Sequence, residues 1–153
     1  MKATHPKSGF TLVEIMITTS IIGLLASLGM PSMLKAGKNT RNARFAREIK
    51  TAGHAFVQYA LITGEYPADK NPAQMPNGMA EYLNRFPWGE DTVIGGQWDW
   101  DYEVFGIHAG VSVKSPDADE EQMRKIDALI DDGDLGSGQF RQRSGGYIYI
   151  LES

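Results

Sequence analysis

The sequence predicts an α+β fold in which one long N-terminal helix packs on a small antiparallel sheet with short helices. Three patterns predict it. Apolar residues recur at spacings of three and four through the first 63 residues, whereas aromatic and acidic residues alternate strictly from residue 98 onward. Glycine and proline cluster between these two regions and punctuate the loops. At 153 residues, the chain has room for one soluble domain beside its N-terminal apolar segment.

We expect the long helix to run from about Thr11 to Thr63. In its second half the apolar positions follow helical spacing, at Ala46, Ile49, Gly53, Phe56 and Ala60. Gly64 and then Pro67 end it. Pro31 is a weak point, because proline removes one backbone hydrogen bond and costs about 3 kcal/mol inside a helix.

The first part of this helix has the length and composition of a membrane span. Between Ser8 and Leu34, Glu14 is the only charged residue. The run 10–34, about 25 residues, is long enough for a hydrocarbon layer of about 30 Å. Lysine and arginine residues flank it on both sides, so their count alone leaves the orientation open.

The rest of the chain predicts a small domain. We expect a short helix over 77–84 and then two strands, 98–104 and 107–113, paired as a hairpin around Phe105–Gly106. Trp98 and Trp100 should face the core, and the acids between them should face water. Ser115 and Pro116 predict the start of a helix that ends at Asp132–Gly133, and 146–151 predicts a last strand.

The N-terminal motif carries a family resemblance. Lys7-Ser8-Gly9-Phe10-Thr11-Leu12-Val13-Glu14-Ile15 places a short basic leader before a glycine, and a hydrophobic helix after it. An ordinary secretory signal has the small residue after its apolar run, which is the opposite order. The motif resembles the class III prepilin signal of type IV pilins and type II secretion pseudopilins. That family also has a proline at the distance of Pro31 from the mature start.

The resemblance implies three parts: a cleaved leader, 1–9; a transmembrane and filament-core helix, 10–34; and a periplasmic pilin-like domain, 35–153. It implies that a prepilin peptidase cuts between Gly9 and Phe10 and methylates the Phe10 amine. The protein would be a structural subunit and no enzyme, anchored by lipid contacts in the bacterial inner membrane. Its partners would be copies of itself, other pilin-like subunits, the peptidase and an inner-membrane assembly platform.

Glu14 is the candidate site residue with the most specific functional interpretation. A charge at mid-depth in a bilayer costs roughly 2.5–3.5 kcal/mol on insertion scales. In one interpretation the side chain snorkels to the membrane surface. In the other, implied by the resemblance, Glu14 pairs with the new α-amine of Phe10 on a neighbouring subunit, and assembly depends on Phe10, Glu14 and Pro31.

An acidic turn is a second candidate site. Four carboxylates fall close together around Gly133, at Asp127, Asp131, Asp132 and Asp134. Calcium prefers several oxygen ligands at 2.3–2.6 Å, so these acids could hold it. The spacing does not fit an EF-hand loop, and a solvated helix end is the alternative. Trp98 and Trp100 could likewise form a carbohydrate platform, although core packing is the commoner use of alternating aromatics.

Composition narrows the function classes. The net charge of −4 becomes −6 once Lys2 and Lys7 leave with the leader, so we expect no nucleic-acid partner. The chain has no cysteine, in contrast to many pilins, and this favours a pseudopilin. His54 and His108 have no second ligand at metal-site spacing.

Two alternatives to a structural filament subunit remain. One is a minor tip pilin whose domain binds a ligand or partner, and the other is a membrane-tethered binding domain that does not assemble.

Overall fold

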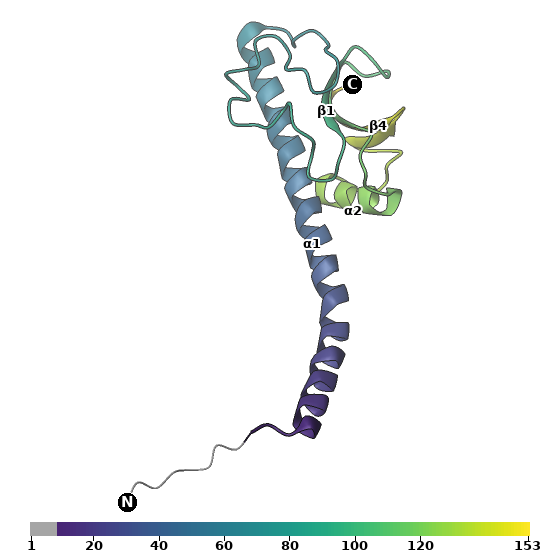
Figure 1. The fold of residues 1–153 in the computed structure, drawn as a ribbon. Helices are drawn as coiled ribbons and strands as arrows, with labels where there is room; N and C mark the ends of the chain where they lie inside the picture. The colour runs from purple at the N-terminus through teal and green to yellow at the C-terminus, as the bar shows by residue number, and fades with distance from the viewer. Residues whose placement is uncertain (1–8) are drawn as a thin grey trace, which may run out of the picture. The chain divides into compact units, whose positions relative to one another are not determined.

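The computed structural model describes residues 9–153 as a long helix, a short helix and a four-stranded antiparallel sheet (Figure 1). The chain divides into two compact units, 1–38 and 39–153, and helix α1, Leu12–Thr63, contributes to both. The expected α+β fold is confirmed. The expected leader, 1–9, lies outside the described residues except for Gly9.

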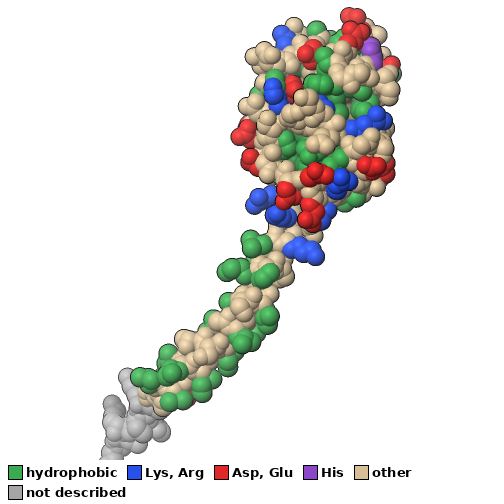
Figure 2. Space-filling model, turned by 90° about the vertical axis from the view of Figure 1, so that its right-hand side faces the viewer, with side chains coloured by type: hydrophobic (Ala, Val, Ile, Leu, Met, Phe, Trp, Pro, Cys, Tyr) green, Lys and Arg blue, Asp and Glu red, His purple; other side chains and the backbone are tan. Residues whose placement is uncertain are grey.

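In the first unit, α1 continues through Pro31 without interruption. Hydroxyl side chains bond back to carbonyls of the preceding turn; Thr19 Oγ1 lies 2.9 Å from the Ile15 oxygen and Ser20 Oγ 2.8 Å from the Met16 oxygen. Such bonds satisfy polar groups inside an otherwise apolar helix. Leu12 and the other large apolar side chains up to Leu34 are exposed (Figure 2), and α1 is long and apolar enough here to cross a membrane.

In the second unit, α1 buries one face against the sheet. Four of the five predicted positions are buried, and the fifth, Ala60, is half-buried. Phe45 and Ala52, which were not predicted, are fully buried beside Ile49 and Phe56. Gly53 lies on the same face, and a Cβ there would come within 2.9 Å of Leu151 Cδ2. The helix ends as expected: Gly64 adopts a φ of 91°, and its N–H donates to the Ala60 oxygen at 2.8 Å.

The sheet has the order β1-β2-β4-β3, with every neighbouring pair antiparallel. The strands are β1, Gln97–Tyr102; β2, Ala109–Lys114; β3, Phe140–Arg143; and β4, Gly146–Glu152. The predicted hairpin is confirmed, because β1 and β2 pair directly, with Trp100 opposite Val111. The last strand was expected one residue shorter, and β3 was not expected.

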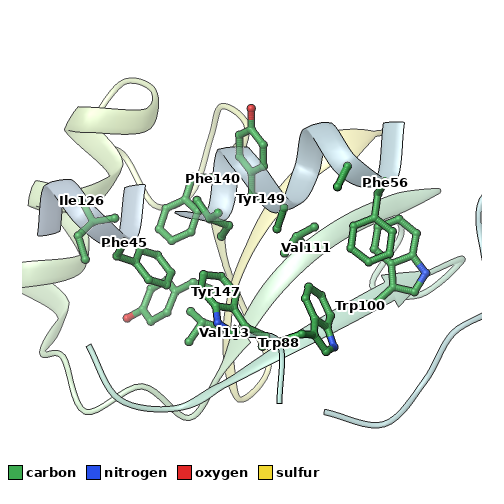
Figure 3. Packing of buried hydrophobic residues seen from close by; sticks show 14 of the residues in the cluster. Phe45, Phe56, Trp88, Trp100, Val111, Val113, Ile126, Phe140, Tyr147 and Tyr149 are labelled. Carbon is green, nitrogen blue, oxygen red and sulfur yellow. The ribbon is translucent and has the colours of Figure 1, made fainter. Parts of the chain in front are cut away.

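Aromatic rings fill the space between α1 and the sheet (Figure 3). Phe45 stacks on Trp98 with ring centroids 5.5 Å apart, and meets Phe140 of β3 edge-on at 6.3 Å. The ring centroid of Trp88, from the loop before β1, lies 5.4 Å from that of Phe56. This cluster joins both ends of the packed half of α1 to the sheet.

Two predicted helices differ from the structure. The segment 77–84 forms turns, because Gly78 adopts a φ of 81° that breaks a helical path. Helix α2 is Glu120–Ile130, and its N-cap is Asp119, whose carboxylate accepts the Gln122 N–H at 2.8 Å. Ser115 has a φ of 51° and donates its N–H to the Gly145 oxygen, so it cannot start the helix.

Candidate functional site

The start of α1 is held by a reciprocal pair of side chains, Thr11 and Glu14. Glu14 Oε2 accepts the Thr11 backbone N–H at 2.9 Å and Thr11 Oγ1 at 2.8 Å. In return, the Glu14 N–H donates to Thr11 Oγ1 at 3.2 Å. This is a capping box, which satisfies N–H groups that have no partner within the helix. The Thr-x-x-Glu spacing is its sequence signal, and the sequence analysis missed it.

The capping box occupies only one oxygen of the Glu14 carboxylate. Within residues 9–153, no hydrogen bond reaches Oε1, and both Thr11 and Glu14 are exposed. The carboxylate is therefore oriented by its own chain, and the part of the chain that the structure describes leaves Oε1 available to an external cation or hydrogen-bond donor.

Gly9 and Phe10, the predicted scissile pair, precede α1 and lie in no regular element. The Phe10 side chain is 86% exposed, and a Cβ added at Gly9 would meet no described atom within 4 Å. Among the described residues, none therefore blocks the access of another molecule to the peptide bond between Gly9 and Phe10.

The acidic turn brings three of its four predicted carboxylates together. One oxygen from each of Asp127, Asp131 and Asp132 lies within 4.8 Å of the others. Asp134 is not in this group; its Oδ1 accepts the Gly136 N–H at 3.0 Å. Asp132 is held by the Asp134 N–H and by Ser137 Oγ, at 2.8 and 3.0 Å, and these bonds lower its pKa.

Asp127 is the unusual member of this cluster. Its side chain is fully buried at the end of α2, and neither carboxylate oxygen has a hydrogen-bond partner among the described residues. Burial raises its pKa to about 6, and the charges of Asp132 and Asp131 act in the same direction. A buried carboxylate without a partner is costly unless a cation or a proton neutralises it.

The alternation in β1 gives one correct and one wrong prediction. Trp98 and Trp100 are buried in the core, so they offer no exposed platform for a carbohydrate. Asp99 and Asp101 were expected to face water, and this is wrong, because they are only 6% and 4% exposed. Both carboxylates bind Arg143, which reaches across the outer face of the sheet from β3.

This polar network is compact. Arg143 Nη2 lies 2.7 Å from Asp99 Oδ2, and Arg143 Nε lies 3.1 Å from Asp101 Oδ2. Ser112 Oγ donates to Asp101, and the guanidinium group stacks on the Phe105 ring at 4.7 Å from its centroid. Sequence reasoning missed it because the cation comes from a strand that periodicity did not reveal.

A comparison with known protein families matches the same N-terminal segment. Residues 4–30 match the family described as the prokaryotic N-terminal methylation motif. The chain is also 30% identical over 109 residues to the type II secretion system core protein G of Escherichia coli (strain K12), covering 61% of this chain and 75% of that protein. The chain belongs to the type IV pilin and type II secretion pseudopilin family.

Other members of this family are similar over different lengths. Core protein G of Vibrio cholerae is 28% identical over 105 residues, which cover 60% of this pilin-like chain and 72% of that protein. The type IV major alpha-pilin of Moraxella bovis is 36% identical over 63 residues, covering 41% of this chain and 39% of that pilin. No solved structure matches significantly. As a member of this family, the protein is a structural subunit of a pilus-like filament.

Proposed function

We propose that this filament subunit is a type II secretion pseudopilin. The observation that carries the choice is the extent of the similarity: the matches to core protein G described above extend over more than 100 residues, against 63 for the type IV pilin. The absence of cysteine is a second, weaker support. The two alternatives, a tip pilin and a tethered domain that does not assemble, have no comparable support.

The proposal includes the maturation of the chain. A prepilin peptidase hydrolyses the bond between Gly9 and Phe10, and the new Phe10 amine is then methylated. The exposed Phe10 side chain and the lack of regular structure at this bond are consistent with a protease substrate. Before assembly, the apolar part of α1 anchors the subunit in the inner membrane with its domain on the periplasmic side. An assembly platform then transfers the helix from lipid into the filament core.

Glu14 gives this transfer its specificity. The capping box orients the carboxylate through Oε2 and leaves Oε1 free, so the Phe10 amine of a neighbouring subunit can bind without breaking the cap. In an apolar environment, leaving either charge unpaired costs several kcal/mol. Pairing is therefore strongly favoured in one register and disfavoured in others. Pro31 lies in the segment whose packing changes during the transfer.

Two variants at the helix start separate the charge from the cap. Glu14→Gln keeps an oxygen that can accept the Thr11 N–H but removes the charge, whereas Thr11→Val removes the hydroxyl and keeps the charge. We expect Glu14→Gln to lower the yield of sheared filaments at least tenfold, the equivalent of about 1.4 kcal/mol. Thr11→Val should lower it by no more than about fivefold, since a cap contributes about 1 kcal/mol. Intact mass must show both variants processed; a normal filament yield from Glu14→Gln would refute the proposed pairing.

A calcium ion at the acidic turn is a second proposal, carried by the buried and unpartnered carboxylate of Asp127. Asp127, Asp131 and Asp132 offer converging carboxylate oxygens, which suit a hard cation. A bound ion would neutralise Asp127 and join the end of α2 to the loop that follows it. Asp134 would act through charge alone.

Thermal unfolding of the full chain in detergent tests the calcium proposal. We expect 1 mM CaCl₂ to raise the unfolding temperature, and 1 mM MgCl₂ to raise it less, because magnesium dehydrates reluctantly. Asp127→Asn should abolish the calcium response while stabilising the metal-free protein, because it removes an unpaired buried charge. The exposed Asp91→Asn is the matched control. An unchanged calcium response in Asp127→Asn would exclude this site.

A further inference from the structure

A pocket of about 330 Å³ lies beside the end of α1 in the domain 39–153 and has no role in the assembly described above. Three rings form one wall: Tyr66 from the loop after α1, Tyr102 at the end of β1, and His108 just before β2. The ring centroids of Tyr102 and His108 are 5.1 Å apart. The centroid of Tyr66 lies 6.0 Å from that of His108 and 6.4 Å from that of Tyr102. The rings are mutually inclined by 50° to 69°, so their faces point in different directions.

The carboxylates beside these rings make the pocket acidic. Glu65 and Glu152 line the pocket, and no lysine or arginine does so among the described residues. Glu103 adds a third carboxylate, with Oε1 4.0 Å from His108 Nδ1. The pKa of the Tyr66 hydroxyl is raised, first by burial and then by the charge of Glu152, which lines the same pocket.

We propose that this pocket binds the ammonium group of a lysine side chain presented by a partner polypeptide. Aromatic faces attract cations through their quadrupoles, and carboxylates at the rim add a direct charge interaction. A flat guanidinium group stacks best on one parallel face, whereas rings inclined to one another suit a compact ammonium ion. Leu61, which also lines the pocket, is 82% exposed and offers an apolar surface for the lysine methylene groups.

This site differs from the assembly contact in position and in chemistry. It uses carboxylates and rings of the soluble domain, and none of the residues at the start of α1. The loop 103–108 that carries part of it is fixed by its own bonds, because the Glu103 N–H donates to the His108 oxygen at 2.9 Å and the His108 N–H to the Glu152 oxygen at 3.1 Å. The backbone at Glu103 and His108 is therefore fixed before a ligand arrives.

The test uses the full chain in detergent micelles, labelled with ¹³C at its tyrosine rings, at pH 8. The probe is N-acetyl-lysine methylamide, and the control probe is the same molecule acetylated on its side-chain nitrogen, which has no charge. We expect saturable shifts of the Tyr66 and Tyr102 signals with a Kd on the order of 1 mM for the charged probe. The acetylated probe should give no saturable shift.

Two surface variants make the test specific. Glu65→Gln combined with Glu152→Gln should weaken binding at least fivefold, whereas the exposed Glu81→Gln, outside the pocket, should change it less than twofold. Retained tyrosine shift dispersion shows that each variant is folded. The proposal is overturned by equal shifts with both probes, by shifts that do not saturate, or by unchanged affinity in the double variant.

Discussion

The ring of Phe56 on α1 lies parallel to the indole ring of Trp100 on β1, with centroids 3.8 Å apart and an interplanar angle of 1° (Figure 3). Trp100 also donates its Nε1–H to the Pro67 oxygen at 2.8 Å. One pair of rings thus joins the helix, the sheet and the loop that leaves the helix. The end of α1 is fixed against the domain at this point.

Truncation of this ring should destabilise the domain strongly. We expect Phe56→Ala to lower the free energy of unfolding by about 3–5 kcal/mol, because it leaves a cavity beneath Trp100 and removes the ring contact. Urea unfolding followed by tryptophan fluorescence measures the change. Ile62→Ala is the control on the same helix; its side chain is 67% exposed, so a comparable loss there would contradict the assignment of this contact.

Gly53 allows α1 to approach β4 closely. Gly53→Ala would gain about 1 kcal/mol of helix propensity, but its Cβ would lie 3.1 Å from Tyr149 Cε1 and 2.9 Å from Leu151 Cδ2. Overpacking costs about 1–3 kcal/mol, so we expect a net loss of about 1 kcal/mol. Gly37→Ala has no described neighbour within 4 Å and should cause no loss in the same urea titration. Equal effects at the two positions would show that close packing does not decide the choice of glycine at 53.

The network on the outer face of the sheet should make stability depend on pH. Burial, and then the charge of Asp101, raise the pKa of Asp99 to about 6, and Arg143 opposes this rise. Between about pH 4 and pH 6 the folded state therefore binds more protons than the unfolded state. Stability from this group consequently falls as the pH rises through that window. Asp127 shifts in the same direction, so only a variant isolates Asp99.

Asp99→Asn should flatten the fall in unfolding free energy between pH 4.5 and pH 7. Removal of the cation should have the opposite effect: Arg143→Met leaves two buried carboxylates without their partner and should cost about 3–5 kcal/mol at pH 7. Its cost should be smaller at pH 4.5, where protonation relieves the unpaired charge. Arg85→Met, at an exposed position, is the control. A cost for Arg143→Met that is the same at both pH values would contradict this account.

The sequence predicts the parts of the fold that depend on local periodicity. Apolar spacing predicted the buried face of α1, and alternation predicted that Trp98 and Trp100 enter the core. Prediction from local sequence patterns failed where a contact with a distant segment decides the local structure. The sequence predicted that the helix starts at Ser115, but the Ser115 N–H donates to the Gly145 oxygen and α2 begins only after Asp119.

The same limit applies to the candidate sites. The motif from Lys7 to Glu14 predicted the family, because its residues are adjacent in the chain. The burial of Asp99 and Asp101 could not be predicted, since it depends on Arg143, more than 40 residues away. The ring wall of Tyr66, Tyr102 and His108 likewise forms only when the end of α1 meets the ends of β1 and β2.

The maturation of the N-terminus tests the central claim most directly. Intact mass and N-terminal sequencing of the protein from its native membranes, with and without the prepilin peptidase, give the answer. The account predicts a mature chain that begins with N-methylated Phe10, and an unprocessed chain when the peptidase is absent. A chain that still begins at Met1 in the presence of the peptidase, or that is cut beyond the apolar segment, would contradict the proposed assembly through Phe10 and Glu14.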